Sequence, residues 1–255
     1  MTFTTSREAY DAFMGRYADL LAPRLIAFAG VEPGDRVLDV GCGPGSLTQP
    51  LAELVGPDHV AAVDPSEPFA AANAERVPGA DVQVGSAESL PWAADSFDAA
   101  LAQLVVNFMS DADASIAEMR RVVRPGGILA ACTWDYSGGM TMLRTFWDAA
   151  LSLDSGTPDE GRTMRYNDPD ALRELWLGAG LEAVETDALV VEASYQNFDD
   201  YWVPFTAGVG PAGAYTSSLD PDRRAALREE CRRRLGDPDG AFTLSAKAWA
   251  VKGRV

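Results

Sequence analysis

Apolar and polar positions follow two alternating periods along the first half of the chain. Short apolar or β-branched runs, typical of buried strands, alternate with segments whose apolar residues recur every three or four positions, as in amphipathic helices. The expected strands are 36–40, 59–63, 81–84, 97–104 and 128–133. The expected helices are 46–55, 66–77 and 112–123, the last of them stopped by Pro125, Gly126 and Gly127. This alternation predicts an α/β fold, a parallel sheet with helices on both faces.

The regular alternation of predicted strands and helices ends after Trp134. Helices are expected near 143–153, at 169–177 behind an Asp168 cap, and at 221–235, while strand-like stretches stand at 183–195 and 242–251. A Gly- and Pro-rich stretch at 208–214 lies between these last two strands. Because a strand pattern resumes afterwards, we expect one domain over 31–255 with substrate-side insertions at about 135–165 and 197–240, preceded by an N-terminal helical lid segment over 1–30.

The charge balance narrows the classes of partner. Asp and Glu number 38 against 21 Lys and Arg, a formal net charge of −17. Nucleic acids and anionic membranes are bound through Lys and Arg, so neither is expected as a partner, and a small-molecule substrate is. The run Arg232 to Arg234 follows Glu229 and Glu230, which is typical of a solvated helix face.

Cysteine and histidine usage indicates a cytoplasmic protein without a bound metal. The three cysteines are far apart, and His59 is the single histidine, so the spacing of a zinc site is missing. No apolar run approaches a signal-peptide core or a membrane span. His59 begins a strand, at the edge opposite the one where such sheets bind ligands, and we expect it to be structural.

The strongest candidate for chemistry is a glycine-rich turn after the first strand. Gly41, Gly43 and Gly45, with Cys42 among them, let the backbone approach a ligand, and Asp64 ends the next strand, where it can hold ribose hydroxyls. These features permit either NAD or S-adenosylmethionine. Ser46 breaks the last position of the dinucleotide pattern, and Asp39 beside the turn would repel a pyrophosphate but attract a sulfonium. The sequence therefore favours S-adenosylmethionine.

This turn resembles motif I of class I methyltransferases, and the chain resembles the group that includes the ubiquinone and menaquinone C-methyltransferases. Three further stretches, 63–66, 85–98 and 118–127, are similar to the family's ribose-binding motif, its adenine-binding loop with the fourth strand, and the helix and turn before the fifth strand. The resemblance covers about residues 30–135. It implies a Rossmann-like, seven-stranded, mostly parallel sheet with the last strand antiparallel and a helical insertion or lid.

The resemblance also assigns cofactor-binding residues. It places Asp39 and the turn Gly41, Cys42, Gly43 and Gly45 at the methionine end of the cofactor, together with Gln103 after the fourth strand. Asp64 goes to the ribose, and Pro65, Ala87 and Glu88 go to the adenine. Ser86 stands where the family usually has an acid bonded to the adenine amino group, so either Ser86 or Glu88 is expected to accept that bond. In relatives the N-terminal segment folds over the cofactor, where Tyr17 or Arg16 could reach its carboxylate.

The predicted function is S-adenosylmethionine-dependent methyl transfer to a small molecule. A nicotinamide-dependent oxidoreductase and a non-catalytic S-adenosylmethionine-binding protein are the alternatives, and the acceptor atom stays open among oxygen, nitrogen and carbon. Asp135 is the candidate base, because a carboxylate in an apolar pocket can have a raised pKa. Other candidates for the substrate side are Asn107, Trp134, Tyr136, Tyr201, Trp202 and Tyr215.

Overall fold

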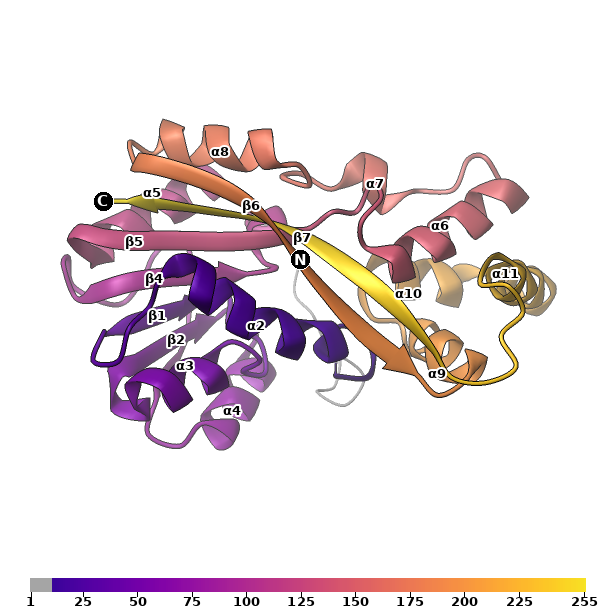
Figure 1. Cartoon of the computed structure of the whole chain (residues 1–255), viewed down its shortest axis with the longest axis horizontal. Coiled ribbons are helices and arrows are strands. Elements are labelled where there is room, and N and C mark those ends of the chain that lie inside the picture. The colour runs from indigo at the N-terminus through magenta and orange to yellow at the C-terminus, as the bar shows by residue number, and fades with distance from the viewer. Residues whose placement is uncertain (1–10) are drawn as a thin grey trace.

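The fold is built on one seven-stranded sheet with the strand order β3-β2-β1-β4-β5-β7-β6 (Figure 1). The computed structural model describes residues 11–255. Its strands are β1 Val37–Val40, β2 Val60–Asp64, β3 Asp81–Val84, β4 Phe97–Gln103, β5 Val123–Trp134, β6 Glu182–Tyr195 and β7 Phe242–Arg254. The first five are parallel, and β7 runs antiparallel to both β5 and β6. The predicted Rossmann-like topology is therefore confirmed.

Helices cover both faces of this sheet, as expected. Along β1 the buried side chains alternate: Val37 belongs to one core cluster and Leu38 to the other, the period-two pattern of a strand. The first cluster packs against α2 Arg16–Ala29 and α3 Thr48–Val55. The second packs against α5 Ala112–Val122 and α8 Pro169–Gly178. Helix α4 Glu67–Arg76 lies beside β2 and β3.

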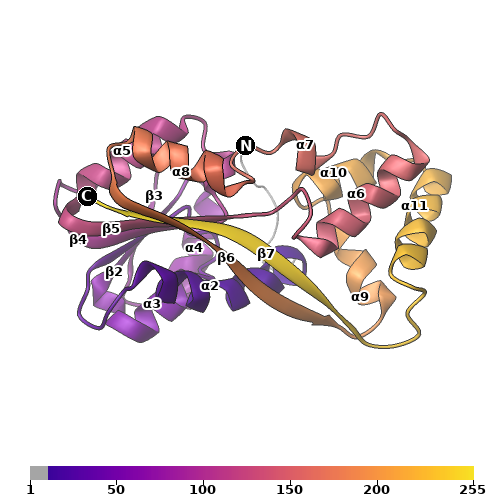
Figure 2. The same cartoon turned by 45° about the horizontal axis from the view of Figure 1, so that its top comes forward.

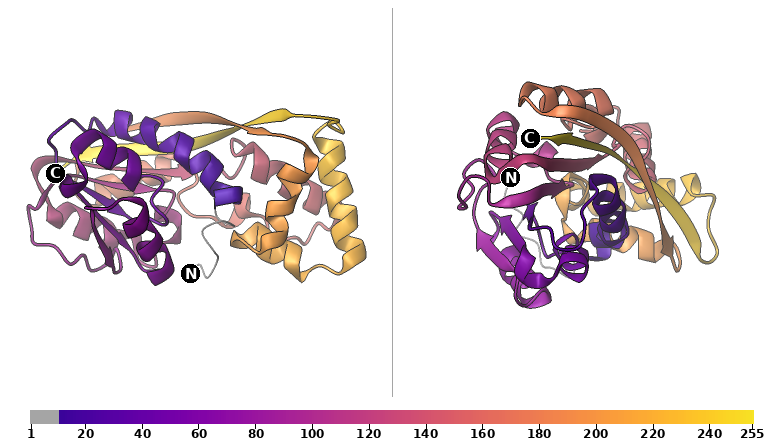
Figure 3. Two further views of the ribbon diagram at one scale, coloured as in Figure 1. Left: turned by 90° about the horizontal axis from the view of Figure 1, so that it is seen from below. Right: turned by 60° about the vertical axis from the view of Figure 1, so that its left-hand side comes forward.

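A long ribbon carries the chain beyond the sheet. Strands β6 and β7 pair from Glu182–Arg254 to Tyr195–Phe242, whereas β5 stops pairing with β7 at Trp134–Ala248. The ribbon ends beside a group of helices that we name the cap (Figures 2 and 3). The cap consists of α6 Thr141–Leu153, α7 Glu160–Thr163, α9 Phe198–Trp202, η4 Val203–Ala207, α10 Gly210–Ser218 and α11 Pro221–Arg234.

Two local expectations need correction. Helix α5 ends at Val122 and β5 begins directly at Val123, so the Pro-Gly-Gly turn is part of the strand and not a separate connection. Gly127 makes this possible, because a Cβ there would lie 2.5 Å from the carbonyl oxygen of Asp98. The Gly- and Pro-rich stretch 208–214 runs into helix α10, whose first turn accommodates Pro211.

The N-terminal segment enters the described part of the chain as a π-helix, η1 Asp11–Gly15, that continues into α2. Residues 1–10 of the expected segment 1–30 lie outside the described residues. Helix α2 packs against the sheet and against β6 of the ribbon. Within residues 11–255, none of the helices has the length and apolar character needed to span a membrane.

Candidate functional site

A cavity of 340 Å³ opens at the carboxyl ends of β1, β2 and β4 and continues to the cap. This is the edge at which open α/β sheets bind ligands. Its sheet end is lined by the glycine turn and by the loops after β2, β3 and β4: Gly41, Gly43, Val63, Asp64, Pro65, Ser66, Phe69, Gly85, Ser86, Ala87, Glu88, Gln103, Leu104, Val105, Phe108, Met109 and Ser110. Its cap end is lined by Trp134, Tyr136, Leu143, Glu160, Val209, Gly210, Pro211 and Ala212, and Phe13 and Met14 complete the wall.

The glycine turn presents bare backbone to this cavity. The amides of Gly41 and Cys42 both donate to the carbonyl of Val63, at 2.8 and 3.0 Å, which fixes the turn against β2. Gly41 has a φ of +71°, and a Cβ there would lie 2.4 Å from Val105 Cγ2. Both constraints require glycine. Gly45 and Cys42 do not line the cavity, and Gly45 instead lies against the side chain of Asn73.

Asp64 is fixed at the cavity wall by two backbone amides. Its Oδ2 accepts from Gly43 N at 2.9 Å and its Oδ1 from Ser66 N at 2.8 Å. Burial raises its pKa, and the two amides counteract part of that rise. Each carboxylate oxygen keeps a second lone pair, so the group can accept further hydrogen bonds from a pair of hydroxyls.

Asp39 lies beneath the turn rather than in the cavity wall. Its Oδ2 accepts from Thr48 Oγ1 at 2.6 Å, and that hydroxyl accepts from Asn73 Nδ2 at 2.8 Å. Burial raises the pKa of Asp39 to about 7, and the nearby negative charge of Asp64 adds to the rise. Of the two predicted carboxylates, Asp64 lines the cavity and Asp39 does not, so the structure does not bring Asp39 into direct contact with the cavity.

The predicted adenine-side residues Pro65, Ser86, Ala87 and Glu88 all line the cavity. The Ser86 hydroxyl donates to the Glu88 carboxylate, which also accepts from the amides of Ser110 and Asp111 at 3.1 and 3.3 Å. Slight burial opposes ionisation, but the Ser86 hydroxyl and these amides outweigh it, so the pKa of Glu88 is lowered. Glu88 thus connects the loop after β3 to the loop before α5 as an ionised group.

Gln103 supplies an unused acceptor at the end of β4. Its Nε2 donates to the carbonyl of Ala18 at 3.1 Å, which sets the orientation of the amide. Its Oε1 is buried and has no hydrogen-bond partner within residues 11–255. A buried carbonyl oxygen without a donor is costly, and a ligand ammonium at this position would satisfy it.

The two N-terminal candidates are engaged elsewhere. The fully buried Tyr17 exchanges a hydrogen bond with the hydroxyl of Tyr195 at 2.9 Å. Arg16 forms an ion pair with Asp200 at 2.7 Å and stacks over the Tyr195 ring. Neither side chain lines the cavity, and this segment contributes Phe13 and Met14 to it instead. Sequence reasoning did not single out these two apolar residues, because an apolar residue of an amphipathic helix ordinarily packs against the rest of the fold.

The aromatic candidates for the substrate side divide into two groups. Trp134 and Tyr136 line the cap end of the cavity, and the buried Asn107 donates to the Tyr136 hydroxyl at 3.3 Å. The others are packed within the cap, outside the cavity lining: Tyr201, Trp202 and Tyr215. His59 lies in the short helix η2 Pro57–His59 at the amino end of β2, also away from the cavity.

The interpretation of Asp135 as a base with a raised pKa is wrong. Lys247 Nζ lies 2.8 Å from its Oδ2, and Ser137 Oγ donates to its Oδ1 at 2.9 Å. Partial burial favours the neutral form, but Lys247 and Ser137 outweigh it, so the pKa of Asp135 is lowered. Asp135 does not line the cavity. It is a structural carboxylate that connects the end of β5 to β7.

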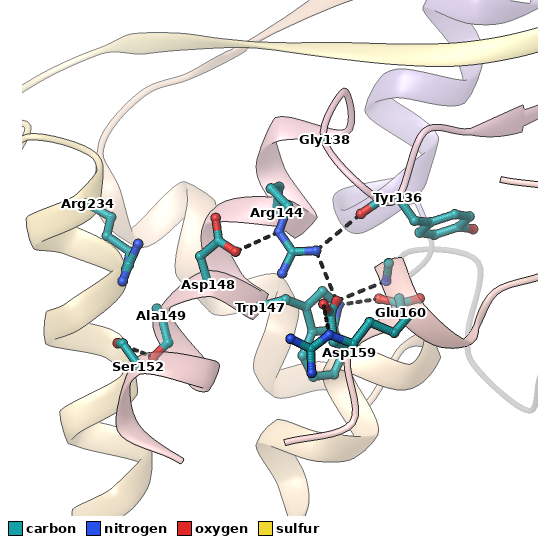
Figure 4. Close-up of polar contacts among 12 residues, drawn as sticks. Tyr136, Gly138, Arg144, Trp147, Asp148, Ala149, Ser152, Asp159, Glu160 and Arg234 are labelled. Carbon is teal, nitrogen blue, oxygen red and sulfur yellow. Dashed lines mark hydrogen bonds and ion pairs between the residues drawn. The ribbon is translucent and has the colours of Figure 1, made fainter. Parts of the chain in front are cut away.

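Sequence reasoning missed a different carboxylate, Glu160 at the start of α7. It is only 4% exposed, it lines the cap end of the cavity, and its Oε2 accepts from Trp147 Nε1 at 2.6 Å (Figure 4). Burial raises its pKa to about 7. In the sequence, the flanking residues Asp159, Gly161 and Arg162 are typical of a solvent-exposed loop. Glu160 is buried because α6 packs across this loop.

Comparison with known proteins supports the interpretation of the sheet end. Residues 38–131 match the family model described as "Methyltransferase domain". This range runs from β1 to β5 and contains the glycine turn, Asp64, the loop after β3 and Gln103.

Curated relatives share this part of the chain. An uncharacterised protein of Mycobacterium bovis is 33% identical over 169 residues, which cover 62% of this chain and 60% of that protein. An uncharacterised methyltransferase of Schizosaccharomyces pombe is 28% identical over 156 residues, 53% of this chain and 55% of that protein. An uncharacterised protein in a transposon of Streptomyces fradiae is 36% identical over 110 residues, 41% and 32% of the two chains. The chain thus spans between about a third and 60% of these relatives.

Solved structures share the fold at low identity. A methyltransferase from an antibiotic biosynthesis pathway of Anabaena variabilis has a TM-score of 0.61 at 16% identity, over 92% of this chain and 97% of that chain. A phosphoethanolamine N-methyltransferase of Haemonchus contortus, solved with S-adenosylhomocysteine, has a TM-score of 0.58 at 17% identity, over 97% and 56%. A [4+2]-cyclase has a TM-score of 0.56 at 20% identity, over 97% and 86%. Residues 38–131 are thus similar to a methyltransferase domain, and the strand order and these likenesses show that the chain has the fold of these methyltransferases.

Proposed function

We propose that the protein transfers a methyl group from S-adenosylmethionine to a small-molecule acceptor. The main support is the continuity of one cavity from the glycine turn and Asp64 to the apolar wall of the cap. A cofactor at the sheet end and an acceptor at the cap end would then share one space, which in-line transfer requires. The methyltransferase domain at 38–131 favours this proposal over the nicotinamide-dependent alternative.

The residues at the sheet end suit this cofactor. The ribose has two hydroxyls for the Asp64 carboxylate, and the methionine ammonium would meet the unpartnered Oε1 of Gln103. Pro65 and Ala87 offer apolar surface to the adenine, and either Ser86 or Glu88 would accept from its amino group. Asp39 lies behind the turn, so it would attract the positively charged sulfur of the cofactor by long-range electrostatics, without direct contact.

The bound cofactor would supply a methyl group on a positively charged sulfur. The chain's own contribution would be positioning: Asp64 and Gln103 hold the donor, while Trp134, Tyr136 and Leu143 shape an apolar space for the acceptor. Apolar walls exclude water and keep the acceptor at attacking distance, which can supply a large part of a rate enhancement.

Four finer assignments belong to the same proposal. The four motif stretches support a place near the ubiquinone and menaquinone methyltransferase-like group. The net charge of −17 supports a small-molecule substrate rather than nucleic acid or a membrane surface. Three buried free cysteines, Cys42, Cys132 and Cys231, support action in a reducing cytoplasm. The N-terminal segment and the cap would together close over the substrate.

Methyl transfer is tested with S-adenosylmethionine labelled in its methyl group and a metabolite extract as the source of acceptors. The proposal predicts label in a small-molecule fraction with the native chain and its loss with Asp64→Ala. Cofactor binding without any labelled product would favour a non-methylating role instead. That outcome is a real alternative, because a [4+2]-cyclase has the same fold.

A further inference from the structure

The cap end of the cavity contains one carboxylate in a largely apolar wall. Glu160 lines the cavity beside Leu143, Val209 and Pro211 and is 4% exposed. Its Oε2 accepts from Trp147 Nε1, and within residues 11–255 no second donor contacts this carboxylate. Trp147 is itself buried and packs edge-on against Phe146, with ring centroids 5.0 Å apart. The carboxylate is therefore held in place with part of its accepting capacity unused.

The neighbouring cations do not neutralise Glu160. Arg144 Nε pairs with Asp148 at 2.8 Å, and its Nη1 pairs with Asp159 at 3.0 Å and also reaches the carbonyl of Tyr136 (Figure 4). The exposed Arg162 lies 3.8 Å from Asp159 as well. Two arginines thus face three carboxylates in this group, and their ion pairs go to Asp148 and Asp159. Arg144 acts on Glu160 only through its field, so the carboxylate without an ion pair is the one that lines the cavity.

We propose that Glu160 binds a protonated amine of the acceptor, which makes the substrate a largely apolar amine. This inference rests on the proposed methyl transfer and specifies its acceptor. A buried carboxylate gains most from a charged donor that brings its own proton and positive charge. An apolar body on the same molecule would suit the walls formed by Leu143, Trp134 and Pro211.

The same residue could also release the nucleophile. Glu160 would take one proton from the ammonium and become neutral, and the freed nitrogen lone pair would attack the methyl carbon. The new N–C bond forms as the C–S bond breaks, and sulfur keeps the electron pair of that bond. A carboxyl group whose pKa is near 7 suits such a proton transfer at neutral pH.

Matched amines and alcohols test the inference in the protein saturated with S-adenosylhomocysteine. The probes are n-hexylamine against n-hexanol and 2-phenylethylamine against 2-phenylethanol, titrated by calorimetry at pH 8. We expect at least one amine to bind about tenfold more tightly than its alcohol, and E160Q to remove that preference. The control E174Q changes an exposed glutamate of α8, and this variant should keep the preference for amines. Alcohols that bind as tightly as amines, or an E160Q protein that keeps the preference, would overturn the inference.

A measurement on the native chain covers the case in which E160Q does not fold. Protonation of Glu160 should weaken amine binding as the pH falls through about 7, while alcohol binding stays level. Parallel pH profiles for the two probes would contradict the inference. Failure of S-adenosylhomocysteine to bind would instead contradict the proposed function, so the two outcomes are distinguishable.

Discussion

Two buried carboxylates, Asp39 and Glu160, stand at opposite ends of the proposed reaction space. One lies beneath the glycine turn and the other in the cap, and burial raises the pKa of each to about 7. Desolvation penalises the charged form, and each group has a single side-chain donor to offset it, Thr48 or Trp147. The charge beneath the glycine turn and the charge at the cap end of the cavity are therefore both sensitive to pH near neutrality.

These two groups predict how stability depends on pH. A carboxyl whose pKa is higher in the folded state than its ordinary value of 3.8 or 4.5 stabilises the fold at low pH and loses that contribution as pH rises through about 7. When the pH is raised from 5.5 to 8, the free energy of unfolding of the native chain should fall. We expect it to fall less in Glu160→Gln, and urea denaturation at the two pH values measures both changes. An unchanged pH dependence in the variant would show that Glu160 is ionised at little penalty in the native chain.

Asp64 and Asp39 predict unequal effects on cofactor affinity. Asp64→Asn should weaken binding of S-adenosylhomocysteine by about tenfold or more, because hydrogen bonds to a charged group contribute about 1.5–3 kcal/mol. Asp39→Asn should weaken it less, since Asp39 does not line the cavity and its Thr48 contact can persist. Calorimetry on the two variants compares them directly. A larger loss of affinity in Asp39→Asn than in Asp64→Asn would indicate that Asp39 contacts the ligand directly.

Asp135→Asn separates structure from catalysis. The substitution removes the ion pair with Lys247, so we expect the free energy of unfolding to fall by about 1 kcal/mol. The rate of methyl transfer should stay within about twofold of the native rate, since Asp135 does not line the cavity. Thermal unfolding and the transfer assay together measure both quantities. A stable variant that has lost its activity would restore Asp135 as a catalytic candidate.

At the scale of elements, the turn between β1 and α3 tolerates no side chain at Gly41. Gly41→Ala places a Cβ against Val105 and forces a positive φ on alanine, so we expect lower stability and loss of S-adenosylhomocysteine binding. The control Gly178→Ala, where no atom lies within 4 Å of the added Cβ, should be neutral or slightly stabilising. Thermal shift with and without S-adenosylhomocysteine measures both effects. A Gly41→Ala protein that binds normally would show that the turn can rearrange.

The strands and helices of the sheet were predictable because each has one dominant period. The run 37–40 is buried on both faces and is apolar except for Asp39, and the helix at 112–122 has a clear apolar stripe, so burial and sequence agree there. The start of β5 was predicted five residues too late, because Gly126 and Gly127 are typical of a turn, whereas here Gly127 allows close contact with Asp98 of β4. Helix α10 was missed because its composition, rich in glycine, gives almost no amphipathic pattern.

The site was predictable where it depends on local backbone. Gly41 and Gly43 follow β1 and Asp64 ends the adjacent parallel strand β2, so their positions follow from the topology. Glu160 and Asp135 were misjudged because their environments come from distant segments: Trp147 of α6 buries one, and Lys247 of β7 neutralises the other. Only long-range packing decides which carboxylate faces the cavity.

At the scale of the whole molecule, the long β6–β7 ribbon positions the cap relative to the sheet. It crosses from the sheet to the cap helices (Figure 2), and the cavity at the carboxyl ends of the strands has walls from both parts. Helix α2 lies along this connection, with a hydrogen bond from Tyr17 to Tyr195 of the ribbon and an ion pair from Arg16 to Asp200 of the cap helix α9. The cofactor end and the acceptor end are thereby fixed by segments far apart in the chain.

The central claim is that the sheet end of this cavity holds a sulfonium cofactor rather than a dinucleotide. Calorimetric titration of the native chain with S-adenosylhomocysteine and, separately, with NAD tests it most directly. We predict one saturable site for S-adenosylhomocysteine with micromolar affinity and no measurable heat from NAD. Saturable binding of NAD without binding of S-adenosylhomocysteine would contradict the account.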